Sequence, residues 1–342
     1  MATIVDKPSL SSLVHELKSA GGSVSGAGIA RGAGVSRTAL WKNVETLRRL
    51  GYEIEASTGV GYRLVATPDK PYPWEVREGL GTQRFGRAVH YFDVIGSTQD
   101  EARRLAEAGA PEGTLVIAEE QRAPRGRMGR SYFTPPGGLW FSLLLRPRRS
   151  LDEVIHLSLL AGVAVHQAIE TETGVRATVR WPNDLLIGER KLVGIGVELA
   201  SEQDVLHHVI IGIGVNVNLS QSDFPPELQP IAISLRDALQ RDVARVPLLQ
   251  RILEGIEALY DRYLAAGPGP ILDAWRALPT IIGERVIVEE LRNRWEGIAE
   301  DVSDDGALLV RTSDGRLHPV VAGDVRIVTP KRSTPNGSGA GL

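Results

Sequence analysis

The sequence predicts an α+β protein of several domains, because the hydrophobic pattern changes three times along its 342 residues. Residues 1–66 combine helical spacing with one hairpin, and residues 67–279 mix apolar strands with long helices. Residues 280–330 carry short strands separated by turns, and residues 331–342 are rich in Ser, Gly and Pro. We therefore expect three folded domains with boundaries at these positions, followed by a disordered tail.

The first 66 residues predict a winged helix-turn-helix, because three helices are followed by a hairpin. Ser36 stands where a residue capping the third helix is expected. The expected elements are helices at Leu10–Ala20, Ala27–Gly32 and Ser36–Leu50, and strands at Glu53–Ala56 and Gly61–Val65.

The outer face of the third helix predicts DNA binding. Five basic residues and one acidic residue lie between Arg31 and Arg49, whereas the net charge of −3 gives no global case for nucleic acid. The alternative is a small helical domain that serves dimerisation or contacts a substrate. The candidate DNA-binding residues are Ser36, Arg37, Thr38, Trp41, Lys42 and Arg48 on the helix, and Arg63 in the wing.

Composition excludes several kinds of site and partner. The chain has no cysteine, which removes disulfides, thiolate metal sites and thiol nucleophiles and fits a reducing cytoplasm. No apolar run reaches about 18 residues and the N-terminus lacks a signal-peptide pattern. We therefore expect a cytoplasmic protein without a membrane partner. No Gly-x-x-x-x-Gly-Lys-Ser/Thr stretch supports a P-loop ATPase.

The middle of the chain predicts a mixed sheet with helices packed on it. Prolines at 68, 71 and 73 mark a linker, and the polar loop Leu219–Pro230 is a candidate lid. Strands are expected at Val89–Val94, Leu115–Ala118, Leu139–Leu145, Ala177–Trp181, Leu185–Ile187, Lys191–Ala200 and Val205–Asn218. Helices are expected at Asp100–Ala108, Asp152–Thr171, Val246–Ala266 and Ile271–Ala277.

The last folded region predicts a small SH3-like barrel of short strands. Turns are expected at Asp304-Asp305-Gly306 and Ser313-Asp314-Gly315. The expected strands are Arg285–Glu289, Glu296–Val302, Ala307–Arg311, Leu317–Val321 and Val325–Val328.

A basic loop between two apolar strands is the strongest candidate binding element. Glycine lets backbone come close to a ligand, and arginine forks match phosphate and carboxylate oxygens. From these residues alone we predict a flexible anion-binding loop, with a solvated basic loop as the alternative. The loop contains Arg122, Arg125, Arg127 and Arg130, with Gly126 and Gly129 between them.

The run Pro124-Arg125-Gly126-Arg127-Met128-Gly129-Arg130 resembles the GRGRxGR loop of biotin protein ligases. The turn Gly34–Arg37 and the wing Gly59–Leu64 resemble the DNA-binding domain of the bifunctional members, the biotin operon repressors. The resemblance extends from this domain to about Val328. Three further motifs stand in the family's order: Gly96-Ser97-Thr98, Arg180-Trp181-Pro182-Asn183-Asp184 and Arg190-Lys191-Leu192-Val193-Gly194-Ile195.

The resemblance implies an ATP-dependent biotin protein ligase, with a central biotin/lipoate ligase-like domain. Such an enzyme forms biotinyl-5'-AMP and transfers biotin to a lysine of a biotin carboxyl carrier protein domain. It would use ATP and biotin as substrates together with Mg²⁺, and it would also act as a biotin-responsive repressor at operator DNA. The alternatives are a ligand-sensing transcription factor with weak or no ligase activity, or a lipoate-protein ligase.

The resemblance also assigns catalytic roles. Arg125 and Arg127 would serve the carboxylate and the α-phosphate, and Lys191 would sit at the junction of these two groups. Asp184 would either help to hold Mg²⁺ or accept a proton from the acceptor lysine, and the sequence does not choose between these roles.

We expect the adenylate to promote a homodimer by ordering Arg122–Arg130 and Leu219–Pro230.

Two ligand sets follow from the same motifs. The expected biotin-binding residues are Ser97, Thr98, Gln99, Gln121, Arg125, Gly126, Arg127, Lys191, Gly194 and Gly196. The expected ATP-binding and adenylate-binding residues are Arg127, Arg130, Trp181, Asn183, Lys191 and Asn216. Two positions depart from the family pattern, since Gln99 replaces the usual asparagine and Pro124 replaces the usual glycine.

Overall fold

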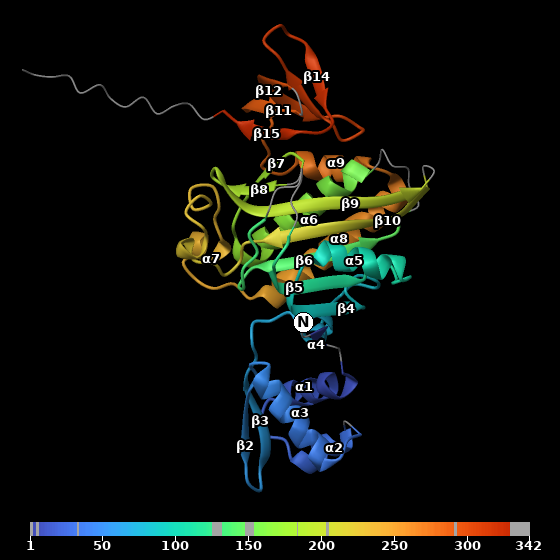
Figure 1. Cartoon of the computed structure of the whole chain (residues 1–342), viewed down its shortest axis with the longest axis vertical. Helices are drawn as coiled ribbons and strands as arrows, with labels where there is room; N and C mark the ends of the chain where they lie inside the picture. Colours follow the sequence, from blue (N-terminus) through green and yellow to red (C-terminus); the bar gives the residue numbers. More distant parts are fainter. Residues whose placement is uncertain are drawn as a thin grey trace, which may run out of the picture.

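The computed structural model describes residues 3–4, 7–32, 34–124, 132–147, 154–182, 184–202, 205–290 and 293–328. Three regions follow one another along its long axis in the order of the sequence (Figure 1). The expected tail at 331–342 lies outside the described residues. The domain boundaries expected at residues 66, 279 and 330 stay predictions.

The N-terminal region is a winged helix-turn-helix, as predicted. The Ser36 hydroxyl accepts a hydrogen bond from the Ala39 N–H at 3.1 Å, so it caps the third helix. Gly61 adopts a φ of +121°, and a Cβ there would overlap the Val24 carbonyl, so the wing needs glycine at this position. The elements are α1 (Pro8–Ser19), α2 (Gly26–Gly32), α3 (Arg37–Arg49), β2 (Glu53–Ser57) and β3 (Gly61–Ala66).

The central region is built on an eight-stranded sheet in the order β1-β4-β5-β6-β10-β9-β8-β7. Strands β4 and β5 run parallel and the other neighbours run antiparallel, so the sheet is mixed, as predicted. The bounds are β1 (Thr3–Ile4), β4 (Val89–Ile95), β5 (Leu115–Gln121), β6 (Leu139–Leu145), β7 (Thr178–Arg180), β8 (Asp184–Ile187), β9 (Arg190–Glu202) and β10 (Val205–Val215).

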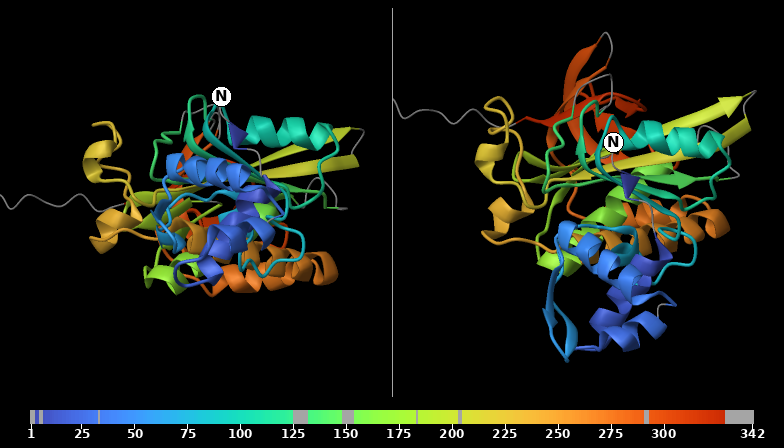
Figure 2. Two further views of the ribbon diagram at one scale, coloured as in Figure 1. Left: turned by 90° about the horizontal axis from the view of Figure 1, so that it is seen from below. Right: turned by 60° about the horizontal axis from the view of Figure 1, so that its bottom comes forward.

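Helices cover both faces of this sheet (Figures 1 and 2). Side chains alternate across a strand, so Val116 and Ala118 of β5 pack with α5 while Leu115 and Ile117 pack on the opposite face. The long helices bury that second face, which belongs to the largest core cluster. The helices are α5 (Thr98–Glu107), α6 (Val154–Thr173), α8 (Arg245–Ala266) and α9 (Gly269–Arg276).

Several short elements were not expected. Pro73, taken as part of a linker, begins the helix α4 (Pro73–Arg77), because proline is tolerated in a first helical turn. The others are β1, α7 (Leu235–Leu239) and the 3₁₀ turn η3 (Gln221–Asp223) within the candidate lid. Each is five residues or shorter, so its apolar residues complete too few turns to give a periodic signal.

The C-terminal region is a five-stranded antiparallel sheet in the order β14-β13-β12-β11-β15, which agrees with the predicted small barrel. Gly306 and Gly315 lie in the two predicted turns with φ of +84° and +82°. The strands are β11 (Arg285–Glu289), β12 (Arg294–Val302), β13 (Leu308–Arg311), β14 (Leu317–Val320) and β15 (Asp324–Ile327).

A buried arginine connects the linker to the sheet. Arg245, the first residue of α8, donates from Nε to Asp69 at 2.9 Å and from Nη1 to Glu119 at 3.0 Å. Nη1 also donates to the Gly138 carbonyl at 2.9 Å. A buried charge is stable only when it is paired in this way, so the contacts fix the linker against β5.

Among the described residues, no helix combines the length and the apolar character that a membrane span requires.

Candidate active site

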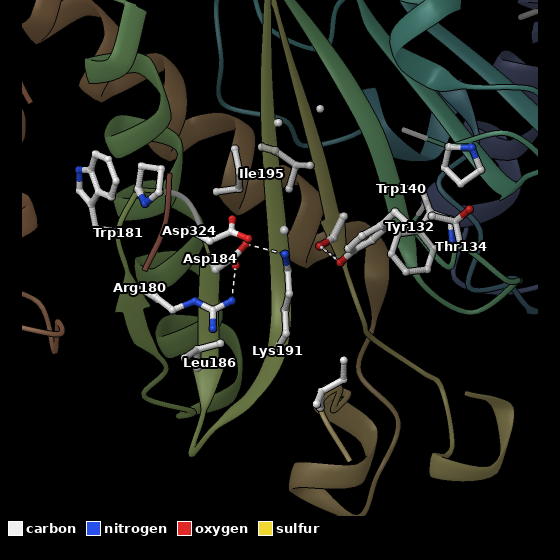
Figure 3. Close-up of a pocket in the computed structure, with 18 of the residues that line it drawn as sticks. Tyr132, Thr134, Trp140, Arg180, Trp181, Asp184, Leu186, Lys191, Ile195 and Asp324 are labelled. Atoms are coloured by element: carbon white, nitrogen blue, oxygen red, sulfur yellow. Dashed lines mark hydrogen bonds and ion pairs between the residues drawn. The ribbon is translucent and has the colours of Figure 1, made fainter. Parts of the chain in front are cut away.

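A cavity of about 510 Å³ lies between the central sheet and strand β15 of the C-terminal region (Figure 3). Its wall brings together residues from motifs that are far apart in the sequence. Of the residues that the sequence predicts as ligand contacts, Thr98, Gln99, Gln121, Trp181, Asp184, Lys191, Gly194 and Gly196 line it.

The cavity exists because four glycines face it from two neighbouring strands. In the β9–β10 register, Gly194 lies opposite Gly214, and Gly196 lies opposite Gly212. A Cβ at Gly212 would come within 2.8 Å of Gln99 Cδ, and one at Gly214 would come within 2.8 Å of Tyr132 Cε1. The missing side chains therefore leave room on the sheet for the Gln99 and Tyr132 side chains, which line the cavity.

Sequence reasoning identified Gly194 and Gly196 and missed their partners. A Gly-x-Gly pattern occurs twice within a pair of adjacent apolar strands, at 194–196 and at 212–214. Pairing the two strands with the glycines in register would have revealed a strip of sheet without side chains.

The polar centre of the cavity is an ion cluster around Asp184. Lys191 Nζ lies 2.6 Å from one carboxylate oxygen of Asp184, and Arg180 Nη2 lies 2.5 Å from the other (Figure 3). Burial alone would raise the pKa of Asp184, but the Lys191 and Arg180 charges outweigh it and hold that pKa below its ordinary value. Asp184 is therefore a carboxylate at neutral pH, and it fixes the position of the Lys191 ammonium.

The ring of Tyr132 completes this centre. Lys191 Nζ lies 5.6 Å from the centroid of the Tyr132 ring, within the range of a cation–π contact. The Tyr132 hydroxyl donates to the Gly214 carbonyl at 3.3 Å, so the ring is held over β10. Tyr132 was not predicted, because a single tyrosine after the basic loop has no motif of its own.

The other end of the cavity carries uncharged hydrogen-bonding groups. Gln121 Oε1 accepts from the Thr98 N–H at 2.8 Å and from the Thr98 hydroxyl at 3.0 Å. The Thr98 hydroxyl in turn accepts from Ser142 at 2.9 Å. These contacts hold Gln121 and Thr98 together in the cavity wall, and their contact with biotin stays a prediction.

The first turn of α5 is not capped by a hydroxyl. Neither the Ser97 nor the Thr98 hydroxyl caps the helix, and Gln121 Oε1 accepts from the Thr98 N–H instead. Among the described residues, the buried Ser97 hydroxyl has no hydrogen-bond partner. Ser97 itself does not line the cavity, so its predicted contact with biotin stays a prediction.

Asn216 does not line the cavity. Its side-chain amide donates to the Lys191 carbonyl at 3.3 Å and to the Ile233 carbonyl at 3.0 Å. Its contact with adenine stays a prediction. The predicted residues Arg125, Gly126, Arg127, Arg130 and Asn183 lie outside the described part of the chain.

The predicted DNA-binding residues lie on and beside α3. Arg37, Thr38 and Lys42 are exposed, and Trp41 is 56% exposed. Ser36 is occupied as the helix cap.

Arg48 and Arg63, the other predicted DNA contacts, have intramolecular partners. Arg48 donates from Nε to the Ile54 carbonyl at 3.0 Å and from Nη1 to Glu45 at 2.7 Å, so it ties the wing to the helix. Arg63 in the wing pairs with Glu55 at 2.7 Å, and both of these side chains are exposed.

All three regions of the chain match known sequence families. The profile of the Biotin/lipoate A/B protein ligase family matches residues 91–216, the HTH domain matches 10–63, and the Biotin protein ligase C terminal domain matches 281–327. The biotin protein ligase from Aquifex aeolicus, solved with biotin and ATP, is similar in structure, with a TM-score of 0.63 and 27% identity. That match covers 71% of this chain and 100% of the other.

Two curated relatives match this chain over most of their own length. The bifunctional ligase/repressor BirA of Bacillus spizizenii is 43% identical over 315 residues, which are 91% of this chain and 97% of that protein. The BirA of Escherichia coli is 31% identical over 86% of this chain and 89% of its own length. The chain therefore belongs to the family of bifunctional biotin protein ligases and repressors.

Proposed function

We infer that the protein is an ATP-dependent biotin protein ligase and a biotin-responsive transcriptional repressor. The observation that carries the ligase function is Lys191, held by Asp184 in a cavity that glycines of β9 and β10 line. In the first step, a carboxylate oxygen of biotin attacks the α-phosphorus of ATP, and pyrophosphate leaves. In the second, the neutral amine of the carrier lysine attacks the carbonyl carbon of biotinyl-5'-AMP, AMP leaves, and the nitrogen releases a proton as the amide forms.

The first step brings two anions together, so the site must supply positive charge at their junction. We propose that Lys191 lies at this junction and that Arg125 and Arg127 supply further charge to the carboxylate and the α-phosphate. If the bound substrates displace water from the cavity, each of these cations would stabilise the transition state more than it would in bulk solvent. Arg130 and Asn183 would complete the phosphate contacts.

Asp184 positions Lys191 in this proposal. Its pKa lies below its ordinary value and both of its oxygens face a cation, so it is a poor acceptor for a proton. This favours a role in orienting Lys191 over the role of general base.

Mg²⁺ would enter with ATP and neutralise part of the phosphate charge. The described residues contain no cluster of three or more side chains that could bind a metal. Mg²⁺ keeps several waters and binds through phosphate oxygens with one or two carboxylates. We propose that Asp184, whose oxygens face Lys191 and Arg180, would supply the protein carboxylate through a remaining lone pair.

The uncharged end of the cavity would bind the ring system of biotin. The Thr98–Gln121 pair lines the cavity and offers donors and acceptors for the urea group, and Ser97 is proposed as a neighbouring contact. The glycines at 194, 196, 212 and 214 would let the rings approach the sheet beside the Gln99 and Tyr132 side chains.

The ligase function is tested by incubating the purified chain with biotin, ATP, Mg²⁺ and a biotin carboxyl carrier domain. Mass spectrometry should show one biotinyl group added to the carrier, and omission of ATP is the control. An unmodified carrier in the presence of bound biotin would identify a ligand-sensing transcription factor instead. Addition of a lipoyl group when lipoate replaces biotin would identify a lipoate-protein ligase.

Removing the Lys191 charge should impair adenylate formation far more than folding. Losing one group that faces developing charge costs roughly 3–4 kcal/mol, so Lys191→Ala and Arg127→Ala should each slow biotin-dependent pyrophosphate release more than about a hundredfold. Arg176→Ala, which removes an exposed arginine paired with Glu170, is the control and should match the wild type. Wild-type rates in Lys191→Ala would remove that residue from the mechanism.

The N-terminal region should bind operator DNA through phosphate contacts from Arg37, Lys42 and Arg63. Each lost contact should weaken binding and reduce the salt dependence of the logarithm of the binding constant by about 1. Fluorescence anisotropy at several salt concentrations measures both quantities for each alanine variant. Arg262 is an exposed residue of α8, and Arg262→Ala should leave the binding constant and its salt dependence unchanged. An equal salt slope in all the variants would contradict the assignment.

We propose that biotinyl-adenylate promotes a homodimer through the central region. Contacts of the adenylate with the loops Arg122–Arg130 and Leu219–Pro230 would fix the surface that a second copy binds, so ligand and partner bind cooperatively. Two winged helices would then span a palindromic operator. Sedimentation should give a larger association constant with biotin and ATP than without them. Identical constants would reject the coupling.

A further inference from the structure

We propose that Trp181 is a positioning residue that docks the C-terminal barrel so that strand β15 forms one wall of the cavity. This inference rests on the proposed ligase function, because it assigns the docked wall to the nucleotide half of the site. Trp181 belongs to the Arg180–Asp184 motif, and the sequence predicts it as an ATP contact. Its indole nitrogen is engaged with the barrel instead.

The docking contact is a buried hydrogen bond between the two regions. Trp181 is 2% exposed, and its Nε1–H donates to the Gly306 carbonyl at 3.0 Å. His156 Nε2 lies 2.9 Å from the carbonyl oxygen of Asp304 in the same turn. Two residues of the central region therefore hold the turn between β12 and β13: Trp181, from the connection between β7 and β8, and His156 of α6.

A third central element binds the strand that leads into this turn. Arg276 of α9 donates from Nε to Asp301 at 2.8 Å and from Nη2 to the Val302 carbonyl at 2.6 Å. In Figure 1 the barrel accordingly lies directly on the end of the central region where β7 and α9 are found. The dock is thus made of directional polar contacts from three separate elements.

The turn fits its dock closely. Gly306 adopts a φ of +84°, and a Cβ at this position would come within 2.6 Å of Ile155 Cγ2. An added methyl group would therefore push the barrel away from α6. Gly315 adopts nearly the same φ, +82°, in another turn of the same barrel, and a Cβ there would meet nothing within 4 Å.

Docking matters for the site because the same barrel supplies β15. Asp324, Val325, Arg326 and Ile327 of β15 line the cavity together with Trp181. Strand β15 pairs with β11, which pairs with β12, so a shift of the β12–β13 turn is carried to the cavity wall through the sheet.

The wall lies on one side of Lys191. In Figure 3, Trp181 and Asp324 are on one side of Lys191, and Tyr132 and Thr134 are on the other. The Thr134 hydroxyl donates to the Gln121 carbonyl at 3.1 Å, so that second side belongs with the proposed biotin end. The barrel wall therefore faces the nucleotide half of the cavity.

Two matched pairs of variants test this assignment. Gly306→Ala adds a methyl group against Ile155, and Gly315→Ala adds one in open space at nearly equal backbone strain. Trp181→Phe removes a bonded indole N–H. Trp74→Phe removes a buried indole N–H that is bonded to the Tyr52 hydroxyl, in α4 and away from the barrel.

We expect Gly306→Ala and Trp181→Phe to raise the KM for ATP at least fivefold in biotin-dependent pyrophosphate release. Their KM for biotin should change less than twofold, and both control variants should match the wild type. A general loss of folded protein would not separate the two KM values in this way. An ATP KM for Gly306→Ala equal to that for Gly315→Ala would overturn the proposal, as would equal effects on ATP and biotin.

Hydrogen exchange of the whole chain provides a readout that does not need activity. Amides of β15 should exchange faster in Gly306→Ala and Trp181→Phe than in their controls, because the docked wall is loosened. Equal exchange within each pair would overturn the docking role. A wild-type chain that releases no pyrophosphate would refute the proposed ligase function, and the exchange data would still decide whether Trp181 docks the barrel.

Discussion

The site depends on one ion pair, in which the Lys191 ammonium lies 2.6 Å from a carboxylate oxygen of Asp184. A lysine on a flexible stem would otherwise sample many positions. Asp184 removes that freedom, because its strand β8 pairs with β9 and its other oxygen is held by Arg180. A cation is therefore fixed beside the cavity before substrates bind, and little reorganisation is needed as charge develops.

The surrounding fold keeps this cation next to open space. Two Gly-x-Gly pairs in register clear a strip of the β9–β10 sheet, and the Tyr132 ring covers its edge. On the opposite side of the sheet, α6 and α8 fill the core and give the strip a rigid support. Arg245 extends the support to the linker, since it bonds Asp69 and also Glu119, two residues from Gln121. The linker that follows the helix-turn-helix and strand β5, which carries Gln121 into the cavity wall, therefore share one buried ionic contact.

The parts of the molecule with a local signal could be predicted from the sequence. Long helices and strands follow from apolar periodicity, and Lys191 and Asp184 stand in contiguous motifs. Trp181 and Gly306 are 125 positions apart, so their docking contact depends on tertiary packing that no local pattern reports. The contact of Arg48 with the wing could not be predicted for the same reason, since the spacing of Arg48 on the helix indicates only a DNA contact.

The most direct test of this arrangement is a crystal structure with a non-hydrolysable analogue of biotinyl-5'-AMP. We predict the biotin rings over the glycine strip, with the urea group at Ser97, Thr98 and Gln121. Lys191 Nζ should lie within about 3 Å of an oxygen at the acyl–phosphate junction, and the adenylate should face β15. An analogue bound elsewhere, or a junction out of reach of Lys191, would contradict the central role given to the Lys191–Asp184 pair.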